Sequence, residues 1–132
     1  MTEEYTLYFD GCSKGNPGKA GIGAVIYLNG EEIWSNSEYI GMQTNNVAEY
    51  SGLIMGLEHA LSLNITDLSI KGDSLLVVSQ VNGSYKVNSE KLIPYYKRAK
   101  DLLKSFNSFN IKHVYRKDNK RADKLSNDAL LM

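Results

Sequence analysis

The sequence lacks the features that would tie the protein to a membrane or to an oxidising compartment. Cys12 is its only cysteine, so no disulfide can form within the chain. No apolar run approaches the roughly 20 residues that a membrane-spanning helix needs. The acidic segment after Met1 lacks the basic and then apolar pattern of a secretory signal. We therefore expect a soluble, cytoplasmic protein that makes no contact with membranes.

The chain is long enough for one hydrophobic core and too short for two. A chain of 132 residues buries about two-thirds of its unfolded surface on folding. Its 42% hydrophobic and 23% charged residues are ordinary for a globular protein, and it contains no repeat or low-complexity tract. We expect a single domain over residues 1–132 and a monomer.

The charges are divided unevenly, although the net charge at pH 7 is zero. Residues 1–70 contain two basic and nine acidic side chains, whereas residues 71–132 contain 13 basic and six acidic ones. Polyanion binding depends on where basic residues gather more than on their total, so the second half is a candidate nucleic-acid contact surface. Alternatively, its lysines lie on outer helix faces and only keep the protein soluble.

Periodicity predicts three antiparallel strands at the start of the chain. Residues 5–10 alternate with a period of two, which places Asp10 on the face opposite the buried one. Further strands are expected over 20–28 and 31–40, and the Asn29–Gly30 pair between them is a strong hairpin signal.

The remaining elements alternate between helices and strands. They are expected in the order helix, strand, helix, helix, strand and helix, at residues 46–63, 68–70, 74–81, 89–105, 109–115 and 119–131. Pro94 should kink the fourth of these elements or mark its start. Three strands joined by hairpins precede two strands reached by helical crossovers, so we expect an α/β fold with a mixed five-stranded sheet and helices on both faces.

Four acidic residues stand at element ends from which folding can bring them together. Asp10 and Asp73 end predicted strands, whereas Glu49 and Asp123 lie in the first turns of predicted helices. The four converge if the first and fourth strands are adjacent. Crowded carboxylates repel one another unless a cation is bound, so convergence implies a site for Mg²⁺ or Mn²⁺. One cysteine and two histidines fit zinc poorly.

Three of these acids also have a structural interpretation. The segment from Asn46 to Glu49 resembles a capping box, and Asp73 could cap the helix that follows it. Asp123 suits a helix amino terminus through the helix dipole. Asp10 has no such role, because a carboxylate late in an apolar strand and followed by glycine caps nothing. Asp10 therefore favours the metal site.

The four acids lie within longer motifs that run along the chain. The motifs are YFDGCSKGNPG at 8–18, TNNVAE at 44–49, GDS at 72–74 and HVYRKDNKRAD at 113–123. In this order, and on this order of elements, they resemble type 1 ribonuclease H over the whole chain. The resemblance implies the ribonuclease H-like fold. It also implies sequence-independent hydrolysis of the RNA strand of RNA/DNA hybrids, leaving 5′-phosphate and 3′-hydroxyl ends.

The resemblance also implies roles for individual residues. Four acids match the family's metal ligands, which implies that they hold two Mg²⁺ ions, replaceable by Mn²⁺, for two-metal catalysis. These acids are Asp10, Glu49, Asp73 and Asp123. The residues that match substrate contacts reach 2′-hydroxyls and phosphates in the shallow groove of the hybrid; they are Asn16, Thr44, Asn45, Asn46 and Ser74. The alternative for Asn16 and Asn46 is ordinary turn and cap chemistry.

The chain departs from the bacterial pattern at several positions. Leu75 stands where many bacterial members have a substrate-contacting glutamine. The mobile histidine after the last strand is missing: His113 falls within the predicted strand, where we expect a packed role. Arg116 follows the strand instead, and its permanent charge can hold a phosphate but cannot titrate near neutrality. Residues 82–87 replace the tryptophan-rich basic handle, as in the compact archaeal-like branch, some members of which also cut RNA/RNA duplexes.

Basic residues in the second half complete the expected substrate surface. They would attract phosphates without reading sequence and give salt-dependent affinity; they are Lys86, Lys91, Lys97, Arg98, Lys100, Lys112, Arg116, Lys117, Lys120, Arg121 and Lys124. Two other functions stay open, because related folds serve DNA recombinases and a chain can keep the fold as an inactive binding module. The presence of all four acids argues against the module.

Overall fold

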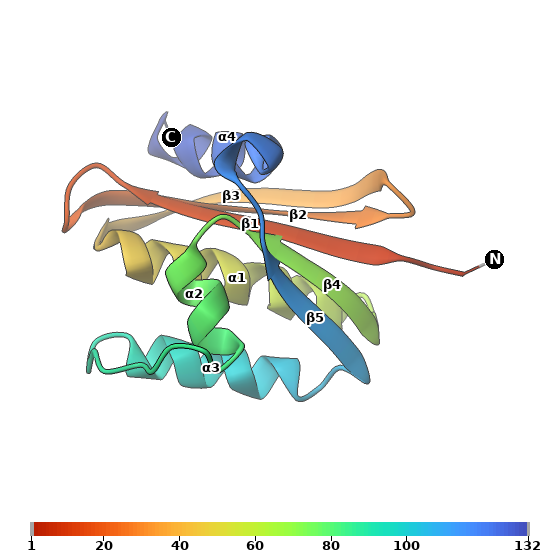
Figure 1. The fold of residues 1–132 in the computed structure, drawn as a ribbon. Helices are drawn as coiled ribbons and strands as arrows, with labels where there is room; N and C mark the ends of the chain where they lie inside the picture. Colours follow the sequence, from red (N-terminus) through yellow and green to blue (C-terminus); the bar gives the residue numbers. More distant parts are fainter. Residues whose placement is uncertain (1, 132) are drawn as a thin grey trace.

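The five strands form one mixed sheet in a computed structural model that describes residues 2–131 (Figure 1). The strands lie in the order β3-β2-β1-β4-β5. Their bounds are Tyr5–Ser13 for β1, Gly18–Leu28 for β2, Glu31–Gln43 for β3, Asp67–Gly72 for β4 and Ser108–His113 for β5. β1, β2 and β3 pair antiparallel, whereas β4 pairs parallel with both β1 and β5. The predicted mixed sheet is confirmed.

The helices cover both faces of the sheet, as predicted (Figure 1). One face carries α1 (Asn45–Ser62), α2 (Leu75–Val81) and α3 (Ile93–Leu103). The other face carries α4 (Lys120–Asp128), which lies over β1, β2 and β3 between two short 3₁₀ helices, η1 (Arg116–Asp118) and η2 (Ala129–Leu131). Among residues 2–131, no helix combines the length and apolar composition needed to cross a membrane.

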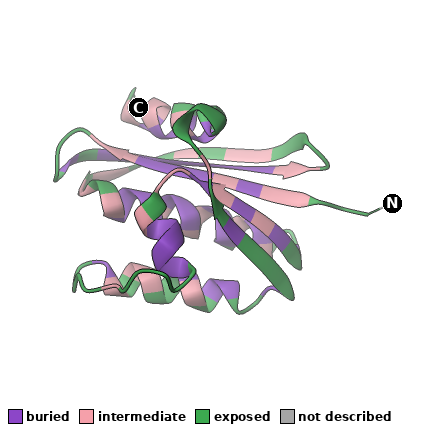
Figure 2. Ribbon diagram, in the orientation of Figure 1, coloured by how far each residue is buried: buried purple, intermediate pink, exposed green. Residues whose placement is uncertain are grey.

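The core lies between the sheet and the helices α1 to α3. Leu7 and Phe9 on β1 are fully buried and belong to one cluster with Leu53 and Leu57 on α1. Figure 2 shows the buried positions running along β1 and α2. This packing follows from the alternation seen in the sequence, because the apolar side of β1 faces α1 and leaves Asp10 on the other side.

Turn chemistry explains where several elements begin. Asn29 and Gly30 both have positive φ, at 51° and 83°, which confirms the tight hairpin between β2 and β3. The helix expected from residue 89 starts later, at Ile93, because Pro94 occupies the first turn, where its missing N–H costs nothing. The closing helix ends at Asp128 and continues only as η2.

The last strand is less buried than its alternation suggests. β5 stops at His113, short of the expected end at residue 115, and Ile111 is its only buried residue. His113 is exposed and packs edge-on against Tyr115, with 5.7 Å between the ring centroids. The prediction of a packed role for His113 is therefore wrong, because β5 is an edge strand that, within residues 2–131, pairs only with β4.

Candidate active site

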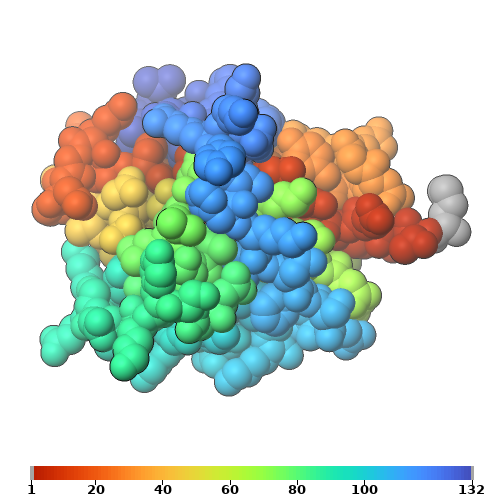
Figure 3. All heavy atoms as spheres, viewed as in Figure 1, coloured from red at the N-terminus to blue at the C-terminus, as the bar shows by residue number. Residues whose placement is uncertain are grey.

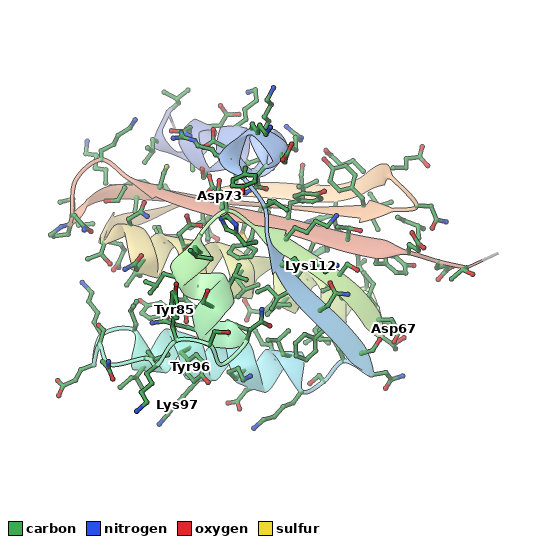
Figure 4. The ribbon with its side chains drawn as sticks, viewed as in Figure 1. Asp67, Asp73, Tyr85, Tyr96, Lys97 and Lys112 are labelled. Atoms are coloured by element: carbon green, nitrogen blue, oxygen red, sulfur yellow. The ribbon has the colours of Figure 1, made fainter. Side chains whose placement is uncertain are left out.

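Three of the four acids meet at one edge of the sheet. β1 and β4 run parallel with Phe9 opposite Gly72, so the next residues, Asp10 and Asp73, leave the two strands at the same edge. Glu49 reaches this edge from α1. One carboxylate oxygen from each of these acids lies within 4.8 Å of the others. Figure 4 labels Asp73 at the point where β4 gives way to α2.

Close contact between β1 and α1 brings Glu49 to the site. A Cβ on Gly11 would collide with the backbone of Ala48, so glycine allows the strand and the helix to touch there. The Gly11 N–H donates to the Glu49 carboxylate at 3.1 Å. This bond fixes the Glu49 side chain beside Asp10.

Other residues cap the helices that follow the acids. The Thr44 hydroxyl accepts from the Val47 N–H at 3.3 Å at the start of α1. The Ser74 hydroxyl does the same for α2, accepting from the Val77 N–H at 3.2 Å. The capping-box interpretation of residues 46–49 and the capping role for Asp73 are therefore wrong. Since Glu49 and Asp73 cap nothing, their carboxylates are left for the site.

Asp123 enters the same pocket from the first turn of α4. Asn119 positions this turn through two hydrogen bonds. Its side-chain NH₂ group donates to the Phe9 backbone carbonyl at 3.0 Å, and its backbone carbonyl accepts from the Asp123 N–H at 3.0 Å. Asp123 stands outside the group of three but contacts Arg116, whose guanidinium lies 3.3 Å from it. The pocket, of about 250 Å³, is lined by Asp10, Gly11, Cys12, Asn45, Glu49, Asp73, Arg116 and Asp123.

Burial and mutual repulsion make two of the acids hard to ionise. Asp10 is 4% exposed, and burial, followed by the charges of Asp73 and Asp123, raises its pKa to about 8. Burial, followed by the charges of Asp10 and Asp73, raises the pKa of Glu49 well above its usual range. A divalent cation would relieve this repulsion, and a set of oxygen donors suits Mg²⁺ or Mn²⁺. The residues present therefore fit such a cation.

Ser126 is a site residue that the sequence did not reveal. It is fully buried on α4, and its hydroxyl donates to the Asp10 carboxylate at 2.8 Å, which lowers the pKa of Asp10 against the larger effects of burial and repulsion. It follows Asp123 at helical i, i+3 spacing. That spacing places both residues on one helix face and is the only signal the sequence offers.

The expected substrate contacts lie around this pocket and also serve the local structure. The Asn16 side-chain oxygen accepts from the Asn45 N–H at 3.1 Å, which joins the loop after β1 to the start of α1. Thr44 and Ser74 act as caps, whereas Asn46 does not. Asn16 and Asn45 are exposed, so their amide groups face solvent beside the acids.

The chain is similar to known proteins in both sequence and fold. The family described as "Reverse transcriptase-like" matches residues 8–129. Ribonuclease HI of Halobacterium salinarum is 43% identical over 124 residues, which is 93% of this chain. The crystal structure of an RNase H1 from the same archaeon superposes with a TM-score of 0.94 at 41% identity, covering 96% of this chain and 97% of that one. This chain belongs to the type 1 ribonuclease H family.

Membership in the type 1 ribonuclease H family confirms the resemblance seen in the motifs and the expected fold. LC11-RNase H1, solved in complex with an RNA/DNA hybrid, has a TM-score of 0.91 and 36% identity, with 96% of each chain covered. The chain spans 62% of the length of the Halobacterium salinarum relative. It spans 34% of a bifunctional protein of Mycobacterium tuberculosis that is also 43% identical.

Proposed function

We propose that this chain is an endonuclease that hydrolyses the RNA strand of RNA/DNA hybrids by two-metal-ion catalysis. The observation that carries the proposal is the cluster of Asp10, Glu49 and Asp73, with ligand oxygens within 4.8 Å and Asp123 lining the same pocket. These acids belong to the four motifs of the family. The hybrid bound by a relative of the same fold gives further support for the substrate.

The four carboxylates would hold two Mg²⁺ ions, or Mn²⁺ in their place, and bound ions would supply an activated water and positive charge to offset the charge that develops on the phosphate. The water oxygen bonds to phosphorus and the water loses a proton, while the bond from phosphorus to the 3′ oxygen breaks and that oxygen takes up a proton. The products then carry 5′-phosphate and 3′-hydroxyl ends. Burial of Asp10 and Glu49 keeps bulk water from screening their charges.

Short polar side chains beside the acids give the site its preference for RNA. The Asn16 and Asn45 amides face solvent at the rim, where they can reach a 2′-hydroxyl, the group that distinguishes RNA from DNA. Thr44, Asn46 and Ser74 lie close by in the chain. Farther out, Lys97 on α3 extends from the surface (Figure 4) and can attract phosphates without reading bases.

A side-by-side assay with labelled duplexes and Mg²⁺ tests the proposal. We expect cutting of the RNA strand in the hybrid, cutting of the RNA/RNA duplex at a lower rate and no cutting of DNA. DNA strand transfer would instead identify a recombinase, and binding without cutting would identify an inactive module. Sedimentation of the same sample tests the expected monomer.

Arg116 is expected to assist turnover more than binding. Its side chain is 77% exposed and lies 3.3 Å from Asp123, where its fixed charge can face the scissile phosphate. Arg116→Ala should lower the single-turnover rate by about tenfold or more and leave the hybrid dissociation constant unchanged. Arg116→Lys, which keeps the charge, should recover part of the rate. An unaltered rate with weaker binding would contradict this role.

Ser126 should set the pH at which the site becomes active. Loss of its hydrogen bond raises the pKa of Asp10 further, so ionising Asp10 requires a higher pH. We expect Ser126→Ala to shift the acidic limb of the pH–rate profile upward by about one pH unit. Ser62→Ala, which removes an exposed hydroxyl at the end of α1, is the control. Superimposable profiles for all three proteins would show that Ser126 does not act on Asp10.

A further inference from the structure

A second pocket lies beyond the active site, on the sheet face that carries α4. It has a volume of about 390 Å³ and is bounded by β1, β2 and the segment from η1 to the start of α4. Arg116, at the start of η1, lines the active site, whereas Lys117 to Arg121 line this second pocket. The same short segment therefore separates the two. In Figure 3, the blue spheres of this segment border the red and orange spheres of the strands.

Two tyrosines provide aromatic surface inside this pocket. Tyr8 and Tyr27 both line it and are both half-buried, with rings that meet edge to face at 5.7 Å between centroids. Both side chains are partly exposed at the pocket, and an aromatic ring is a surface that a nucleic-acid base can stack on, whatever its identity. The volume suits one nucleoside and is too small for a duplex.

Positive charge surrounds the two rings. Lys117 and Lys120 line the pocket, and the Lys71 ammonium lies 5.7 Å from the centre of the Tyr8 ring. Within residues 2–131, these three lysines make no ion pair with a carboxylate, whereas Arg121 is held by Glu32 at 2.9 Å. Asp118 is the one acid that lines the pocket, so the free charge there is positive.

The positive charge continues across the open part of the sheet. Tyr8 is opposite Lys71, and Lys71 is opposite Lys112, which Figure 4 labels on β5. The adjacent row, Thr6, Ser69 and Asn110, is uncharged and shares a pocket with Glu3, Glu4 and Asp67, so the positive charge ends at the row of Lys71 and Lys112. α4 packs on β1, β2 and β3, so within residues 2–131 no helix covers β4 and β5 on this face. We call the row of Tyr8, Lys71 and Lys112, together with the pocket, the open-face groove.

We propose that the open-face groove binds a single-stranded nucleic-acid segment that continues from the duplex held at the active site. The tyrosines stack one base, and Lys71, Lys112, Lys117 and Lys120 attract the phosphates on either side. Charge complementarity selects a polyanion, and half-buried rings in a pocket of nucleoside size select unpaired bases over a closed duplex. The groove would thus favour hybrids that end in, or are flanked by, a single strand.

The test measures binding without cutting, so it uses the Asp10→Asn background. Fluorescence anisotropy compares three ligands: a blunt hybrid, the same hybrid with a ten-nucleotide single-stranded extension, and a blunt hybrid lengthened by ten base pairs. Extensions on either strand and at either end are tried. The proposal rests on the proposed substrate, but the two can fail separately. Absence of binding to the blunt hybrid would refute the proposed substrate. Equal affinity for the blunt and the single-strand-extended hybrids would refute the role proposed for the groove.

We expect the single-stranded extension to tighten binding by at least about fivefold and the added duplex to tighten it by less. Lys117→Ala combined with Lys120→Ala should abolish this gain. Lys19→Ala combined with Lys104→Ala, which removes the same charge from two exposed sites outside the groove, should retain it. Tyr27→Leu should lose the gain and Tyr27→Phe, which keeps the ring, should keep it.

Three results would overturn the groove. The first is equal affinity of the unmodified groove for the blunt hybrid and for every extended hybrid. The second is an equal gain from the added duplex, which would make the face a duplex contact. The third is that both double-lysine variants lose the affinity gain from the extension equally, which would mean that the gain depends only on net charge. If Tyr27→Leu fails to fold, the lysine pairs still decide, because all four lysines are exposed.

Discussion

Asp10→Asn is expected to lower cleavage of the hybrid by at least about 10³-fold, the scale of losing one preorganised electrostatic group. Asp10 interacts with each of the other three acids: the charges of Asp73 and Asp123 raise its pKa, and its own charge raises the pKa of Glu49. Asparagine keeps the shape of the side chain but removes the negative charge that attracts a divalent cation. Folding and hybrid binding should change little, because the groups proposed to hold the hybrid are retained.

Asp67→Asn is the matched control, because it makes the same chemical change at the other end of β4 from Asp73 (Figure 4). Asp67 is exposed, and among the described residues its carboxylate accepts side-chain hydrogen bonds only from Ser108 and Thr66. Rates for Asp10→Asn, Asp67→Asn and the unmodified protein are to be measured at saturating hybrid and Mg²⁺, with circular dichroism to verify folding. Full turnover in Asp10→Asn would refute the site assignment.

The second large effect is on stability: without divalent cations, Asp10→Asn should be the more stable protein at alkaline pH. The folded-state pKa of Asp10, about 8, lies above the value of about 4 expected in the unfolded chain. Between these values the folded protein binds a proton that the unfolded chain does not, so the free energy of unfolding falls as pH rises toward 8. Glu49, whose pKa is also raised, contributes in the same direction.

Thermal unfolding in EDTA between pH 5 and pH 9 measures this effect. The variant's Tm advantage should be smallest at pH 5 and should grow by roughly 5–10 °C at pH 9, which corresponds to about 2 kcal/mol for a chain of this size. Mg²⁺ at pH 9 should raise the Tm of the unmodified protein and have little effect on the variant. If the curves of Tm against pH were parallel for the two proteins, the charge of Asp10 would not be destabilising in the folded protein.

Much of the fold was predictable because it depends on local pattern. The alternation around Leu7 and the Asn29–Gly30 turn fixed the first strands, and the change of period at residue 46 fixed α1. The boundaries near Pro94 and at the end of β5 were not predictable, because they depend on tertiary neighbours. His113 alternates like a buried residue, yet it is exposed, since β5 is at the edge of the sheet.

The candidate site divides in the same way between what the sequence reveals and what requires three dimensions. The four acids could be selected from the sequence because their motifs match a family and because Asp10 has no local role. The residue that caps α1 could not be selected from the sequence, because Thr44 and Asn46 offer equally good capping chemistry until the backbone conformation is known. Ser126 was missed because its partner, Asp10, is 116 residues away.

The proposed function depends on folding to gather four carboxylates into one pocket that binds divalent cations. Its most direct test is a crystal soaked in Mn²⁺, with anomalous scattering used to locate the ions. We expect anomalous peaks among the carboxylate oxygens of Asp10, Glu49, Asp73 and Asp123, and their loss in Asp10→Asn. An empty pocket at saturating Mn²⁺, or peaks only at other carboxylates, would contradict it.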